Sequence, residues 1–173
     1  QAAHAPALAH QVQQQIQRLN DLVSDLLSFA RREDPMLEEI DLREIVAGVC
    51  DLHHLDDAAK LEITGKGSAI GDSNLVHRIV LNLVQNAVQA IDGKGHILIR
   101  IDNGQVTVSD DGPGIHSDKR SRIFEPFFTT RTQGTGLGLA ICQKAARAIG
   151  ATLKVMDGPL PGACFVLRLQ PAT

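Results

Sequence analysis

Hydrophobic residues in the first part of the chain recur at steps of three and four, and no glycine interrupts residues 6–33. The apolar positions are Leu8, Val12, Ile16, Leu19, Val23, Leu26 and Ala30. This spacing predicts one long helix with a single apolar seam. Because a lone helix cannot bury such a seam, we expect residues 8–30 to form a homodimer with a second copy. The alternative is packing against the rest of the same chain.

Asp34-Pro35 ends this helix, since the residue before proline avoids helical geometry. Residues 35–40 are then expected to be a linker. Three further helices are expected at residues 42–52, capped by Asp41, at 74–91 and at 137–149. Strands are expected at residues 61–64, 68–70, 96–101, 105–109, 152–156 and 163–169.

The helix expected at residues 74–91 carries a polar stripe beside its apolar face. Arg78, Asn82 and Asn86 are each four residues apart, so they share that stripe. Asparagine is a poor helix former, and two of them one turn apart suggest a function. Their carbonyl oxygens suit one hard cation or a phosphate. The alternative is an exposed, solvated face.

Two glycine clusters follow this helix. Asp110 ends an apolar strand and precedes Gly112 and Gly114, which let the backbone approach a flat ligand; the alternative is an ordinary turn. Gly134, Gly136 and Gly138 lead directly into a helix, whose free N–H groups favour phosphate. Residues 116–133, named here the cover, hold three phenylalanines that we expect to anchor this segment onto the body.

Composition limits the range of functions. The chain of 173 residues has no Trp or Tyr and a net charge of −3, which argues against a nucleic-acid partner. It has no apolar run of about 18 residues and no signal-peptide pattern. We therefore expect a cytoplasmic segment without membrane contact, and the sequence leaves open an anchor elsewhere in a longer parent protein. Cys50, Cys142 and Cys164 are expected to be reduced, buried thiols.

Taken in chain order, these motifs resemble the ATP-binding catalytic domain of sensor histidine kinases. That domain belongs to a superfamily shared with type II topoisomerases, the mismatch-repair ATPase and a heat-shock chaperone. The resemblance covers about residues 41–169, and residues 22–31 resemble the second helix of the kinase dimerisation hairpin. It implies an α+β fold, a two-layer α/β sandwich of the Bergerat type with a mixed sheet and helices on one face. The implied organisation is a dimerisation helix at 1–34, a linker at 35–40 and an ATP-binding domain at 41–173.

The resemblance also implies roles for individual residues. Asn86 would ligate Mg²⁺ with the help of Asn82, and Asp110 would accept a hydrogen bond from the adenine amine. Arg131 would stand near the γ-phosphate, so that Asn82, Asn86 and Arg131 are the expected catalytic residues. The remaining expected ATP-binding residues are Gly112, Gly114, Ile115, Thr130, Gly134, Thr135, Gly136, Leu137 and Gly138.

The implied function is transfer of the γ-phosphoryl group of ATP to a histidine on the dimerisation domain and onward to an aspartate of a response regulator. The alternatives are a serine kinase of the anti-sigma type and a non-catalytic dimerisation module with a degenerate nucleotide site.

Three departures from the family pattern change the expectations. Asn82 stands where the hydrolysing relatives carry a water-activating glutamate, which predicts weak ATP hydrolysis. Gln89 stands where many of these kinases carry a lysine, so Arg131 or Arg78 would supply the charge. His4 and His10 lack the acidic neighbour of a phosphoacceptor motif. We therefore expect that this chain alone does not autophosphorylate.

Overall fold

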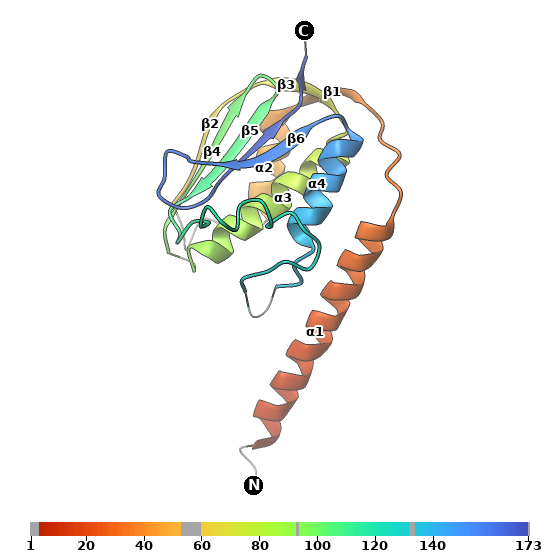
Figure 1. The fold of residues 1–173 in the computed structure, drawn as a ribbon, viewed down its shortest axis with the longest axis vertical. Coiled ribbons are helices and arrows are strands. Elements are labelled where there is room, and N and C mark those ends of the chain that lie inside the picture. The colour runs from red at the N-terminus through yellow and green to blue at the C-terminus, as the bar shows by residue number, and fades with distance from the viewer. Residues whose placement is uncertain (1–3, 53–59, 93, 132–133, 173) are drawn as a thin grey trace.

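The computed structural model describes residues 4–52, 60–92, 94–131 and 134–172. A long helix, α1 (His4–Ala30), extends from a two-layer body as an arm, with the N-terminus at its far end (Figure 1). Its apolar seam is open to solvent: Leu19 is 60% exposed and Val23 54%. The helix contacts the body mainly through α4. The expected helix is confirmed, and the alternative that its seam packs on the same chain is wrong.

The body is built on a mixed sheet of five strands in the order β2-β4-β5-β7-β6. The edge strand β2 (Lys60–Gly65) runs parallel to β4 (His96–Asp102). The other neighbours, β5 (Gln105–Asp110), β7 (Cys164–Arg168) and β6 (Thr152–Met156), pair antiparallel. The two hairpins expected from the sequence are therefore confirmed.

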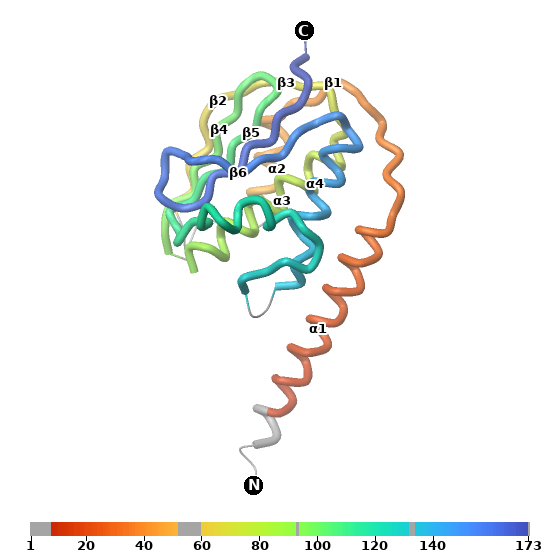
Figure 2. The backbone as a smooth tube through the Cα atoms, in the orientation of Figure 1, coloured from red at the N-terminus to blue at the C-terminus, as the bar shows by residue number. Residues whose placement is uncertain are grey.

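Three helices form the second layer, on one face of this sheet (Figures 1 and 2). They are α2 (Leu42–Leu52), α3 (Ser73–Ala90) and α4 (Gly138–Ala148). Asp41 and Asp72 cap the first two, each accepting hydrogen bonds from the first turn. Side chains such as Leu83 of α3 and Ile99 of β4 are fully buried between the layers. The predicted two-layer sandwich is confirmed.

A second sheet of three short strands, β1-β3-β8, was only partly anticipated. Its centre, β3 (Ser68–Gly71), was expected, but β1 (Glu38–Asp41) begins inside the predicted linker and β8 (Gln170–Pro171) follows the last predicted strand. In β1 only Ile40 is buried, and it lies opposite Ala69 of β3. One buried residue in four gives no periodic signal, so this strand depends on its partner.

The described part of the cover, residues 116–131, lies beneath the sheet edge, beside α3 and α4 (Figure 2). Phe124 and Phe128 pack against the core, and Phe124 meets Phe165 edge to face at 6.4 Å. Phe127 is instead 62% exposed and has a φ of +66°. Two of the three phenylalanines therefore anchor the cover as expected.

All three cysteines are free and buried, as the sequence predicts, and burial raises the pKa of Cys142 to about 12. Among the helices of the described residues, none combines the length and apolar character needed to cross a membrane.

Candidate functional site

The carboxylate of Asp110 lies at the end of β5 and is only 3% exposed. Its Oδ1 accepts hydrogen bonds from the backbone N–H of Gly112 at 2.9 Å and of Ala163 at 3.2 Å. Burial raises the pKa of Asp110 above its ordinary value, and the two N–H donors offset this only in part. Both bonds use Oδ1. No donor among the described residues bonds to Oδ2, so this second oxygen can accept a hydrogen bond from a ligand.

Two glycines make room for this carboxylate. A Cβ on Gly112 would lie 2.9 Å from Asp110 Oδ1 and from the carbonyl oxygen of Ala90, and a Cβ on Gly162 would lie 2.2 Å from the same Oδ1. Gly114 has a φ of +74°, a conformation that favours glycine. The strand end therefore forms a tight backbone cradle around one acidic oxygen, and the half-buried Ile115 extends it toward the core.

Gly162 and Ala163 are site residues that the sequence analysis missed. They lie in the turn before β7, more than 50 positions from Asp110, and reach it because β5 and β7 pair. The two glycines and two prolines at residues 158–162 indicate only a hairpin turn. Long-range strand pairing, which has no local signature, gives this turn its second role.

The asparagine pair of α3 is brought together as expected. Asn86 Nδ2 donates to Asn82 Oδ1 at 3.1 Å, which turns Asn86 Oδ1 away from Asn82. Arg131 of the cover reaches this oxygen at 3.4 Å and the Asn86 carbonyl oxygen at 3.1 Å. Asn86 Oδ1 is an amide carbonyl oxygen, a kind of ligand that a hard cation such as Mg²⁺ accepts. Asn82 is engaged as the partner that orients Asn86.

The second glycine cluster meets the asparagine pair at the start of α4. A Cβ on Gly138 would lie 2.7 Å from Asn82 Nδ2, so a larger residue would displace that amide. Leu137 stands at the N-cap with no side-chain cap bond, which leaves N–H groups of the first turn for a ligand. Gly136 has a φ of +69° and accepts a 2.9 Å hydrogen bond from the N–H of Phe127. These features fit a phosphate-binding loop.

Two other expected residues lie at the margin of this cluster. Thr130 is exposed on the cover beside Arg131. Arg78 forms an ion pair with Glu33, whose side chain is 9% exposed, at the junction between α1 and the body. The charge of Arg78 is therefore paired with that of Glu33. Of the two arginines, Arg131 is the one that contacts Asn86.

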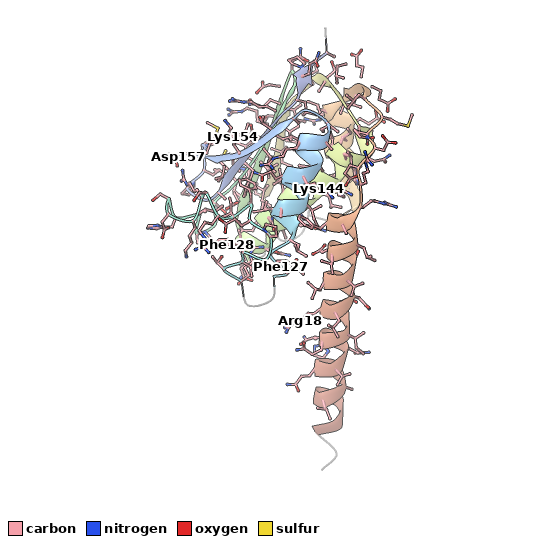
Figure 3. All side chains as sticks on the ribbon, turned by 45° about the vertical axis from the view of Figure 1, so that its right-hand side comes forward. Arg18, Phe127, Phe128, Lys144, Lys154 and Asp157 are labelled. Carbon is pink, nitrogen blue, oxygen red and sulfur yellow. The ribbon has the colours of Figure 1, made fainter. Side chains whose placement is uncertain are left out.

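Helix α1 also contacts the glycine loop and α4. Thr135 donates to Asp25 Oδ2 at 2.7 Å, and Lys144 of α4 donates to the carbonyl oxygens of Phe29 and Arg31, the latter at 2.6 Å. Figure 3 shows Lys144 between α4 and the upper end of α1, with Phe127 lower on the same side of the body. A groove of about 500 Å³ runs between α1 and α3, lined by Asp21, Ser24, Asp25, Val84, Gln85, Val88 and Gln89.

Comparison with known proteins finds sensor histidine kinases among the similar chains. The sensor histidine kinase ZraS of Klebsiella oxytoca is 33% identical over 96% of this chain, which spans 38% of the length of that relative. The structure of full-length ShkA in complex with AMPPNP is similar over 90% of this chain and 36% of ShkA, with 31% identity and a TM-score of 0.72. ThkA in complex with the response regulator protein TrrA matches 91% of this chain and 48% of ThkA, with 25% identity and a TM-score of 0.72.

A family profile also matches residues 71–173, which include α3, both glycine clusters and all but the N-terminal part of the body. The match contains the asparagine pair, the strand-end aspartate and the helix start described above. The chain therefore belongs to the histidine kinase-, DNA gyrase B- and HSP90-like ATPase family.

Proposed function

We propose that this chain binds Mg·ATP and is the catalytic part of a two-component sensor histidine kinase. The observation that carries the proposal is the buried Asp110 carboxylate, whose Oδ1 is held by two backbone N–H groups. The exocyclic amine of adenine is a donor that matches the remaining oxygen, whereas the carbonyl at the same position of guanine is not. Gly112 and Gly114 would leave room for the base.

The phosphate end of the site would be formed by α3, α4 and the cover. Asn86 Oδ1 would ligate the metal while Asn82 holds its amide in place, and the N–H groups from Gly134 to Gly138 would bind the triphosphate. Arg131 would pair with the terminal phosphate. When bound, Mg·ATP would supply the phosphoryl group, and its magnesium ion would neutralise part of the phosphate charge. The protein would then mainly position the reactants.

We further propose that the phosphoryl acceptor is a histidine on a dimerisation domain and that a response regulator receives the group next. The kinase names of the relatives support the first step, and ThkA, seen with a response regulator protein, supports the second. The exposed seam of α1 supports a homodimer through residues 8–30. Because ATP and such regulators are used in the cytoplasm, we propose that compartment for this activity.

Calorimetric titration with Mg·ATP tests the proposal. Asn86→Ala and Asp110→Ala should each weaken binding at least about tenfold, because each removes a ligand contact at a desolvated position. Gln85→Ala is the matched control, since Gln85 is exposed on the same helix next to Asn86. Undiminished affinity in both site variants would contradict the proposal. Histidine kinase names among the relatives favour it over the serine-kinase and degenerate-site alternatives.

A further inference from the structure

Arg131 is held at the C-terminal end of α3 by three acceptors. Its guanidinium donates to Asn86 Oδ1 at 3.4 Å, to the Asn86 carbonyl oxygen at 3.1 Å and to Gln89 Oε1. The backbone around Arg131 is fixed by Thr129, whose Oγ1 accepts from the Arg131 N–H at 3.1 Å. The side chain therefore spans from the cover to a helix 42 positions away in the sequence.

The end of α3 suits this cation for two reasons. The last turn of a helix carries partial negative charge on its carbonyl groups, which attracts a guanidinium. Gln89 adds a side-chain oxygen in this last turn, three residues after Asn86. Arginine has five N–H donors in a planar fork, so it can engage both the backbone and two side-chain oxygens.

We propose that Gln89 is a positioning residue that docks Arg131 over Asn86 when no nucleotide is bound. Arg131 then lies on the oxygen that the proposed function gives to magnesium, and the guanidinium and the metal compete for Asn86 Oδ1. The docking itself depends only on contacts within the chain. Its competition with magnesium rests on the proposed function.

The identity of residue 89 is central to this role. A lysine at this position would repel the guanidinium and leave Arg131 without its Oε1 acceptor. Glutamine accepts a hydrogen bond without adding charge. Arg131 can therefore dock on Gln89 and still be released when a charged acceptor, such as a phosphate, enters the site, because the guanidinium binds a charged acceptor more strongly than a neutral amide.

Trypsin cleavage after Arg131, followed by mass spectrometry on the nucleotide-free chain, measures the docking directly. The protease must capture the arginine side chain, so a docked guanidinium slows cleavage. We expect Gln89→Met, which keeps the shape and removes the acceptor, to speed cleavage after Arg131 about threefold. Gln89→Glu should slow it by a similar factor, because its bond to Arg131 is charge-assisted.

Cleavage after Lys119, which is exposed on the same cover, gives the internal reference rate. Gln85→Met is the matched control and should leave the rate after Arg131 unchanged. Equal rates after Arg131 in the Met, Gln and Glu forms at position 89 would overturn the proposal. The measurement uses no nucleotide, so it decides the docking even if calorimetry shows that the chain does not bind Mg·ATP.

Discussion

The hydroxyl of Thr135 donates a 2.7 Å hydrogen bond to Asp25 Oδ2, joining residues 110 positions apart. This bond connects the glycine loop before α4 to the helix that carries the exposed apolar seam. Lys144 adds a second connection at the end of α1, where its ammonium group also lies 5.5 Å from the ring centre of Phe29. The glycine loop before α4 and the α1 arm are therefore physically coupled.

Removing the Thr135 hydroxyl should loosen this coupling. Thr135→Val keeps the shape but leaves Asp25 without its donor, so amide hydrogen exchange in α1 around Asp25 should quicken by about tenfold. Thr135→Ser retains the hydroxyl, so the α1 amides of this variant should exchange at the same rate as those of the parent chain. Equal exchange in the Val and Ser variants would show that the bond does not restrain α1.

Asp110 and Asp111 are adjacent, but replacing each by asparagine should affect nucleotide binding differently. Asp110→Asn replaces Oδ2 by an NH₂ group that would face the adenine amine donor to donor, so nucleotide binding should be lost. Asp111 accepts from the His96 N–H through Oδ1 at 2.8 Å, a bond that asparagine can also make. Asp111→Asn should therefore bind nearly normally. Calorimetry that ranks the two variants in the opposite order would contradict the assignment.

Substitution of Gly162 should weaken nucleotide binding as much as substitution of the residues of the strand-end motif. In Gly162→Ala the added Cβ would lie 2.2 Å from Asp110 Oδ1 and 2.6 Å from the Gly112 nitrogen, so the cradle must shift. We expect nucleotide affinity to fall at least about tenfold, since a bond to a charged group is lost. Gly48→Ala on α2, where a Cβ meets nothing within 4 Å, is the control and should bind normally. Normal binding by Gly162→Ala would show that the cradle tolerates this shift.

The seam of α1 should support self-association. Leu19→Glu places a charge in the seam and should shift the chain toward a monomeric mass in light scattering at high concentration. Asn20→Glu adds the same charge at the neighbouring exposed position off the seam and should leave the mass unchanged. A parent chain that is strictly monomeric at every concentration would contradict the proposed dimer.

Phosphoryl transfer to this chain itself should not occur. Neither His4 nor His10 is followed in the sequence by an acidic residue that would take its proton. In the structure His10 contacts Gln14 at 3.1 Å. Incubation with radiolabelled ATP should leave the chain unlabelled, and ATP hydrolysis should be weak because Asn82 cannot activate water as a glutamate does. Acid-labile phosphate on either histidine would refute this prediction.

Local patterns in the sequence were sufficient for most of the body. The spacing of Leu83 and its apolar neighbours defined α3, and Asp41 marked a helix start that the structure confirms. The same patterns missed β1, because Ile40 is its only buried residue. A strand of four mostly exposed residues has no periodicity to detect, and it exists because β3 offers an open edge.

The sequence by itself singled out the residues proposed to carry chemistry, since Asn86, Asp110 and the glycines violate ordinary helix and strand preferences at fixed spacings. Only the tertiary structure decided what those residues touch. Pairing of β5 with β7 brings Ala163 to Asp110, and packing of the cover brings Arg131 to Gln89. The physical reason is that periodicity and turn preference act over a few residues, whereas these contacts join segments tens of positions apart.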